Sequence, residues 1–76
     1  MDWQHDIERR PEVMGGKPLI KGTRITVELL LERLGDGWKE EDLLKSYPRL
    51  TADHIRAAQA FAAASLRTDE VVFLDR

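Results

Sequence analysis

The spacing of apolar residues changes at Thr26, and this change constrains the fold more than any other feature of the sequence. Before Thr26, apolar residues come in pairs separated by glycine-containing segments, a pattern typical of short strands joined by tight turns. After Thr26, apolar residues recur at intervals of three and four, the stripe of a helix. The first positions of this stripe are Val27, Leu30, Leu31 and Leu34. We therefore expect a β-hairpin over residues 7–26 and a helical region over residues 27–66.

The hairpin segment contains two apolar pairs, Val13-Met14 and Leu19-Ile20, which we expect to lie in short strands. Glycine adopts a positive φ without the steric cost that a Cβ atom brings. We expect positive φ at the three glycines of this segment, which are Gly15, Gly16 and Gly22.

Three helices are predicted in the second segment, over residues 27–35, 39–46 and 52–66. Thr26 and Thr51 precede the first and third helices and are candidate N-caps, because their hydroxyls accept from free amide groups. The apolar stripe of the third helix consists of Ile55, Ala58, Ala62 and Leu66. Alanine covers most of the remaining surface of this helix, which favours close approach by a second copy of the chain.

The second helix, residues 47–50 and the third helix form a helix-turn-helix pattern. The expected fold class is therefore mainly α: a three-helix, homeodomain-like bundle with a small N-terminal β-hairpin. A continuous apolar run near the C-terminus predicts a short strand or a partner-binding segment within a tail over residues 67–76. This run consists of Val71, Val72, Phe73 and Leu74. Trp3 and Phe73 are candidate interface anchors, since aromatic residues dominate binding hot spots.

The length of 76 residues allows one domain, over residues 1–76. The absence of cysteine excludes disulfides and thiolate metal sites, and the spacing of the two histidines predicts no metal site. No apolar run approaches the roughly 20 residues of a membrane span, and the polar N-terminus is unlike a signal peptide. We expect a cytoplasmic protein that has no cofactor and is not an enzyme.

The net charge of −2 argues against tight nucleic-acid binding by a single copy, because phosphate neutralisation supplies much of the affinity. Residues 1–26 carry five basic and four acidic groups, whereas residues 27–46 carry three basic and six acidic groups. Any DNA binding therefore calls for a homodimer or a larger complex, and the acidic middle suits a basic protein partner.

Two glycine motifs, Gly16-Lys17-Pro18 and Gly22-Thr23-Arg24, stand in this order within residues 11–27. This segment resembles the domain of unknown function 433 family, and the resemblance continues to about residue 66. It implies a short bacterial helix-turn-helix protein that acts as the antitoxin of a PIN-like nuclease toxin. The chain departs from the family pattern at Lys39, where a small hydroxyl residue is usual. It departs again at His54, where an acidic residue usually completes a capping box with Thr51.

In a helix-turn-helix, residues at the start of the second helix of the motif enter the major groove. The corresponding candidates here are Thr51, His54, Arg56 and Gln59. Arginine pairs with guanine and glutamine with adenine, whereas the alternative interpretation is a solvated helix face. A second group of candidates lies in the hairpin, where it either contacts the DNA backbone or is simply solvated. These residues are Lys17, Lys21 and Arg24.

The leading hypothesis is an antitoxin of a type II toxin–antitoxin pair. It would bind the nuclease through the C-terminal tail and its own operator DNA through the helix-turn-helix. A protein-interaction module that does not bind DNA and a stand-alone transcriptional regulator remain as alternatives.

Overall fold

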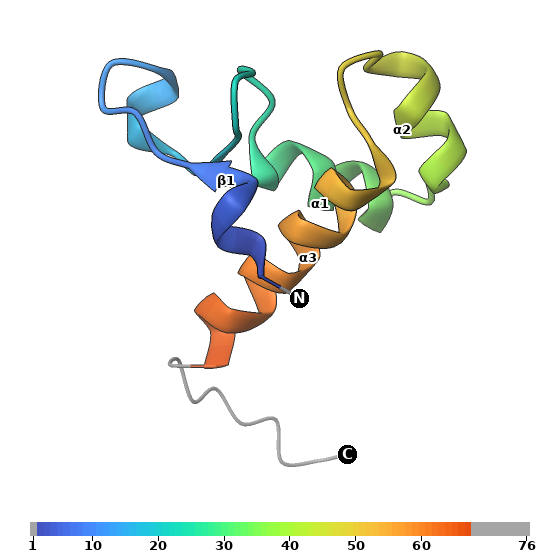
Figure 1. Ribbon diagram of the computed structural model, residues 1–76. Helices are drawn as coiled ribbons and strands as arrows, with labels where there is room; N and C mark the ends of the chain where they lie inside the picture. Colours follow the sequence, from blue (N-terminus) through green and yellow to red (C-terminus); the bar gives the residue numbers. More distant parts are fainter. Residues whose placement is uncertain (1, 68–76) are drawn as a thin grey trace.

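The structure is a computed structural model, and it describes residues 2–67. Within this range the chain forms three α-helices, two short strands and two 3-10 helices (Figure 1). Their bounds are η1 Trp3–His5, β1 Ile7–Glu8, η2 Met14–Gly16, β2 Leu19–Ile20, α1 Val27–Gly35, α2 Glu40–Ser46 and α3 Ala52–Arg67. The prediction of a mainly helical fold with a small N-terminal hairpin is confirmed. The strand predicted over residues 71–74 lies outside the described residues.

The two strands of the hairpin pair antiparallel, with Ile7 opposite Ile20 and Glu8 opposite Leu19. Both side chains of β2 are completely buried. Polar contacts fix the turn that follows β2. Glu8 Oε2 accepts a hydrogen bond from the Gly22 amide at 3.0 Å, and Arg10 Nη2 donates to the Thr23 carbonyl at 2.8 Å. The short hairpin is thus held by the burial of β2 and by charged side chains that bind the turn after it.

The glycine predictions are confirmed, with φ of 66° at Gly15, 81° at Gly16 and 77° at Gly22. The strand predicted at Val13-Met14 was wrong. Val13 is extended, but Met14 already has a φ of 49° and begins η2. The Met14 side chain is 51% exposed, so burial gives no reason for an extended conformation there. The glycines turn the chain away before a strand can pair.

The helix starts follow local hydrogen bonds. Thr26 Oγ1 accepts from the Leu29 amide at 2.9 Å, which confirms the predicted N-cap of α1. Lys39 has no oxygen with which to cap α2, yet the helix begins at Glu40. Asp42 Oδ2 accepts from the Lys39 amide at 2.7 Å, which is the reciprocal half of a capping box, and the Asp42 amide donates to the Lys39 carbonyl at 2.9 Å.

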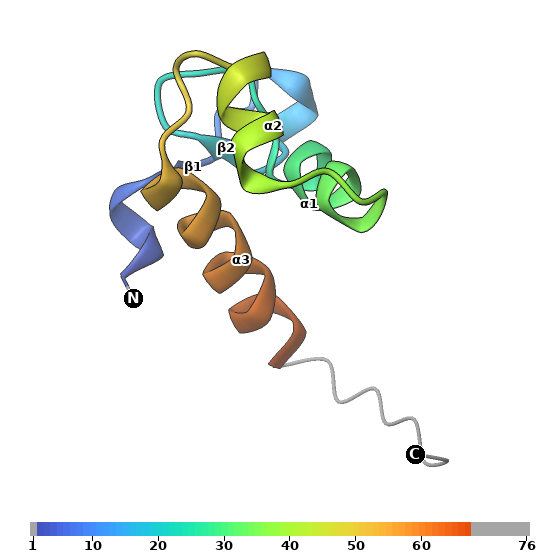
Figure 2. The same ribbon diagram turned by 90° about the vertical axis from the view of Figure 1, so that its right-hand side faces the viewer.

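One core joins the hairpin and the three helices, with α1, α2 and η1 all packed against α3. Its buried residues are Ile7, Ile20, Val27, Leu30, Leu43, Leu50, Ile55, Ala57 and Ala58. Trp3, a candidate interface anchor, packs instead against Phe61 of the same chain, with ring centroids 4.9 Å apart and nearly perpendicular. Leu66 was expected in the apolar stripe but is 66% exposed. Leu66 is in the last turn of α3, and Figure 2 shows that this end of α3 extends beyond the other elements.

Candidate nucleic-acid interface

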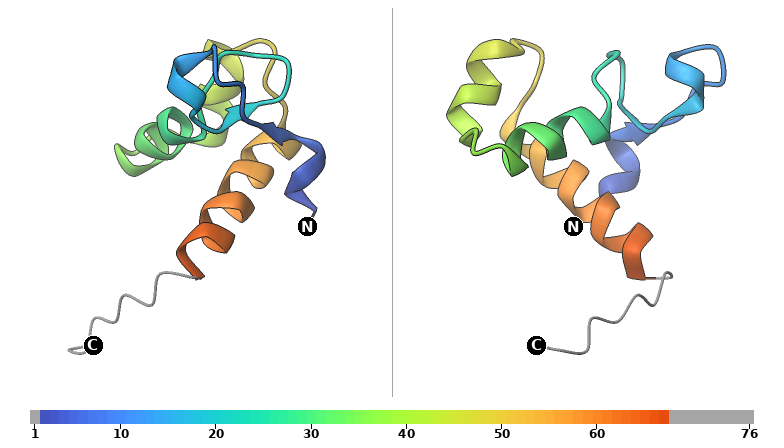
Figure 3. Two further views of the ribbon diagram at one scale, coloured as in Figure 1. Left: turned by 90° about the vertical axis from the view of Figure 1, so that its left-hand side faces the viewer. Right: turned by 180° about the vertical axis from the view of Figure 1, so that it is seen from behind.

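One side of α3 faces solvent along the whole helix. We call the exposed residues of this side the outer face of α3; they are Asp53, Arg56, Gln59, Ala63 and Arg67. Three residues on the opposite side, Ile55, Ala57 and Ala58, are buried. Residues three or four apart share a side of a helix, so burial of one side leaves the other continuous. Figure 3 shows α3 from two further directions.

The first turn of α3 is held by two reciprocal hydrogen bonds. Thr51 Oγ1 accepts from the His54 amide at 3.2 Å, and His54 Nδ1 accepts from the Thr51 amide at 3.1 Å. This is the arrangement of a capping box with histidine in place of the usual Glu or Gln. The departure from the family pattern therefore changes the residue type and keeps the box, because a neutral imidazole nitrogen accepts hydrogen bonds.

The capping role of Nδ1 also determines how Nε2, the other ring nitrogen of His54, can bind a ligand. Since Nδ1 accepts a hydrogen bond, the proton of the neutral ring is on Nε2. The ring is partly exposed at the start of the helix, where the backbone dipole is positive. The Nε2 proton is thus available to an acceptor such as a phosphate oxygen.

Arg56 is engaged within its own helix. Its Nη1 lies 2.7 Å from Oδ1 of Asp53, and both side chains are well exposed. An exposed pair at this spacing stabilises a helix by only about 0.5 kcal/mol or less. Arg56 can therefore leave Asp53 at little cost when a stronger acceptor approaches. Gln59 lies one turn further along the same face.

The basic candidates of the hairpin lie apart from α3. Lys17 and Arg24 line a shallow hollow of about 270 Å³ to which α3 contributes no residue. Lys17 Nζ is 3.0 Å from Glu28 Oε1, and Glu32 lines the same hollow, so acidic groups offset much of its charge. Lys21 is exposed in the turn between β2 and α1. The structure thus brings Lys17 and Arg24 together but joins neither to the outer face.

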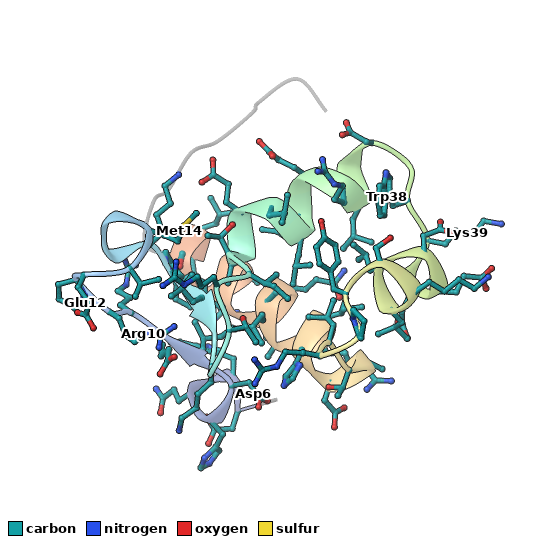
Figure 4. All side chains as sticks on the ribbon, turned by 90° about the horizontal axis from the view of Figure 1, so that it is seen from above. Asp6, Arg10, Glu12, Met14, Trp38 and Lys39 are labelled. Atoms are coloured by element: carbon teal, nitrogen blue, oxygen red, sulfur yellow. The ribbon has the colours of Figure 1, made fainter. Side chains whose placement is uncertain are left out.

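The start of α2 is acidic, because its first turn exposes Glu40, Glu41 and Asp42. The adjoining Trp38 lies at the opposite end from Met14 (Figure 4), and the Arg33 guanidinium lies 5.3 Å from the centre of its ring. Exposed carboxylates repel phosphate, so α2 is the least suitable of the three helices for a nucleic-acid backbone.

The sequence reasoning missed a groove between α1 and the C-terminal half of α3. Its volume is about 560 Å³. Two of its residues, Leu31 and Phe61, are partly buried against the core, and a third, Leu66, is exposed. The signal of this surface in the sequence was the pair of apolar stripes, since Val27, Leu31, Ala62 and Leu66 all belong to them and line the groove.

Among residues 2–67, no group of three or more His, Cys, Asp or Glu side chains is placed to hold a metal ion. None of the described helices is both long and apolar enough to cross a membrane.

A family model and a solved structure point to one family. The family described as "Protein of unknown function (DUF433)" matches residues 7–62. The uncharacterized protein y4eO of Sinorhizobium fredii is 36% identical over 66 residues, which are 86% of this chain and 30% of that protein. The crystal structure of a DUF433 member from Anabaena variabilis superposes with a TM-score of 0.79 at 34% identity. That match covers 86% of this chain and 64% of the other. The chain thus spans less than a third of the curated relative, and it belongs to the DUF433 family.

Proposed function

We propose that the chain is an antitoxin that binds operator DNA through the outer face of α3 and a PIN-like nuclease toxin through its C-terminal tail. One observation supports the DNA part most directly. Arg56 and Gln59 stand on a solvent-facing side of α3, while burial of Ile55, Ala57 and Ala58 anchors the opposite side. A rigidly held helix with an open polar face is what major-groove reading needs.

The dimensions of α3 suit the major groove. An α-helix with its side chains is about 10–12 Å across, and the groove is about 12 Å wide. Alanines at positions 52, 60 and 63 keep the helix slim beside the two polar side chains. Arg56 and Gln59 are three residues apart, a rise of about 4.5 Å. This is close to the 3.4 Å step between base pairs, so the two side chains suit adjacent base pairs.

Phosphate contacts would come from the first turn of α3 and from the hairpin, which lies apart from the outer face. The Nε2 proton of His54 and the exposed Lys21 and Arg24 are the donors that we assign to the DNA backbone. With a net charge of −2, one copy supplies few such contacts. We therefore place DNA binding in a homodimer, which doubles their number and engages two half-sites.

The toxin part rests on the family resemblance and on the apolar sequence of residues 71–74, which lie outside the described residues. An apolar segment of this length can add as a strand to a partner sheet or fill a groove. Such a contact should survive high salt, whereas DNA binding should weaken steeply with salt.

Fluorescence anisotropy with DNA from upstream of the gene tests the DNA part. The double variant Arg56→Ala/Gln59→Ala should lose about tenfold or more in affinity for the operator and bind unrelated DNA as the parent does. The double variant Lys21→Ala/Arg24→Ala should instead weaken binding to both DNAs. It should also lower the slope of log K against log salt concentration by about two, because two phosphate contacts are lost.

The variant Lys39→Ala, which removes one exposed charge from the start of α2, is the matched control and should bind as the parent does. Unchanged operator affinity in Arg56→Ala/Gln59→Ala would show that α3 does not read DNA. Co-purification tests the toxin part separately. The nuclease encoded beside this gene should be retained by the full chain and lost by a chain ending at Arg67.

The Asp53–Arg56 pair favours a second candidate, a protein-interaction module that does not bind DNA. In that function the pair neutralises the outer face, and the acidic first turn of α2 meets a basic partner. Anisotropy that shows no binding to the upstream DNA even at low salt would support this alternative.

A further inference from the structure

The groove between α1 and α3 is an open, largely apolar surface. The helix α3 contributes Phe61, Ala62, Ser65 and Leu66 to one wall. The other wall combines Pro18 with four residues of α1, which are Val27, Glu28, Leu31 and Glu32. Exposed apolar surface of this kind in a soluble chain is a common mark of an interaction site.

Leu66 gives this surface a projecting part as well as a hollow. It is the most exposed of the large hydrophobic residues in the described range, at 66%, and it lines the groove. A copy of the chain thus carries both an apolar side chain that needs cover and a hollow that can receive one. Two-fold symmetric contacts need such self-complementary surfaces, because each copy uses the same residues.

We propose that this groove is the contact surface between two copies of the chain, with Leu66 of each copy packed into the groove of the other. Ala62 and Ser65 support this contact, since small side chains allow two helices to approach closely. Packed helices lie about 8–10 Å apart, depending on the side chains between them. The inference concerns self-association and holds whether or not the chain binds DNA.

The charges around the groove fit the same partner. Glu28 and Glu32 stand on the α1 wall, and Glu28 is already paired with Lys17 at 3.0 Å. Glu32 makes no ion pair among residues 2–67. Arg67 belongs to the outer face and not to the groove wall, but it follows Leu66 in the last turn of α3 and is exposed. When Leu66 enters the groove of the partner, the long Arg67 side chain can therefore reach that acidic wall. Each copy thus brings a positive charge to the negative wall of the other.

The spacing of the two Arg56 side chains in such a dimer matters for DNA binding, and this point rests on the proposed function. Arg56 lies ten residues before Leu66, a distance of about 15 Å along the helix axis. Two helices that meet near Leu66 therefore place their Arg56 side chains up to about 30 Å apart. This is close to the roughly 34 Å that separate half-sites one turn of DNA apart.

Light scattering of the full chain over a range of concentrations tests the contact. The parent chain should have twice the mass of one copy, and Leu66→Glu should have the mass of one copy with unchanged helical circular dichroism. Met14→Glu is the matched control, because Met14 is also a large exposed hydrophobic residue, at 51%, but lies outside the groove. It should keep the mass of the parent.

A charge exchange tests the geometry of the contact. Arg67→Glu and Glu32→Arg should each weaken the dimer about two- to tenfold, and the chain with both changes should recover most of the loss. The variant Arg56→Ala/Gln59→Ala should keep the mass of a dimer. The failure of DNA reading and the failure of dimerisation are therefore distinguishable.

Two outcomes would overturn the proposal. One is a parent chain with the mass of a single copy at the highest concentration that stays in solution. If a chain ending at Arg67 then dimerises, residues 68–76 occupy the groove in place of a second copy. The other is a dimer that persists in Leu66→Glu, which would place the contact elsewhere.

Discussion

The two halves of α3 have similar compositions and very different surroundings. Residues 52–59 and residues 60–67 are both rich in alanine. The first half contains the buried Ile55, Ala57 and Ala58, whereas the second half contains no residue that is fully buried. Apolar spacing therefore identifies the side of a helix that can be covered. Whether that side is covered depends on how far the neighbouring elements extend.

The second half of α3 is covered from one side only. Trp3 of η1 packs edge-on against Phe61, and the Arg9 guanidinium lies 5.9 Å from the centre of the same ring. On the other side is the groove against α1. Each proposal concerns one half of α3. The first half contains the residues proposed to read DNA, and the second half contains the proposed contact between copies.

The largest effect should come from shortening the side chain of Ile55. Ile55→Ala removes a residue that is 3% exposed and should lower the free energy of unfolding by about 2–5 kcal/mol. Leu66→Ala should change it by about 0.5 kcal/mol or less in dilute solution. Urea unfolding followed by circular dichroism measures both.

The two variants should also differ in their dependence on chain concentration. The cost of Leu66→Ala should grow with concentration, because a contact between copies stabilises the chain by mass action. The cost of Ile55→Ala should stay large at every concentration. Equal costs in dilute solution would contradict the division of α3 into a covered and an open half.

An intermediate effect is expected at Trp3. Trp3→Ala removes the edge-on contact with Phe61 and should cost about 1–3 kcal/mol, of which about 0.5–1.5 belongs to the ring geometry. Trp3→Phe keeps an aromatic ring and should recover part of the loss. Thermal unfolding of the three chains measures this. A Trp3→Ala variant as stable as the parent would show that η1 contributes nothing to the cover of α3.

The smallest effect should come from the capping box. Thr51→Ala and His54→Ala should each cost about 1 kcal/mol, because each leaves an amide of the first turn without its side-chain acceptor. His54→Gln keeps an acceptor and should be close to the parent. A His54→Gln variant as unstable as His54→Ala would show that the hydrogen bond from the Thr51 amide contributes little. Urea unfolding resolves differences of this size.

Much of the fold and part of the site were predictable from nearby residues. The caps at Thr26 and Thr51 and the positive φ at Gly22 depend on groups within a few positions of each other. The candidates Arg56 and Gln59 followed from their place near the start of the second helix of the helix-turn-helix pattern, and they are indeed exposed together. The capping role of His54 was not predicted, because the usual box uses Glu or Gln, although histidine accepts the same hydrogen bond.

Sequence patterns were enough to predict the order of the elements, the caps of α1 and α3, and the shared exposure of Arg56 and Gln59. The folded chain was needed to show that Met14 and Leu66 are exposed, that Trp3 packs against Phe61, and that Lys17 pairs with Glu28. The two groups differ in the distance along the chain over which the interactions act. Caps, turns and periodicity act between residues close in the chain, whereas burial and ion pairing depend on elements that folding brings from elsewhere.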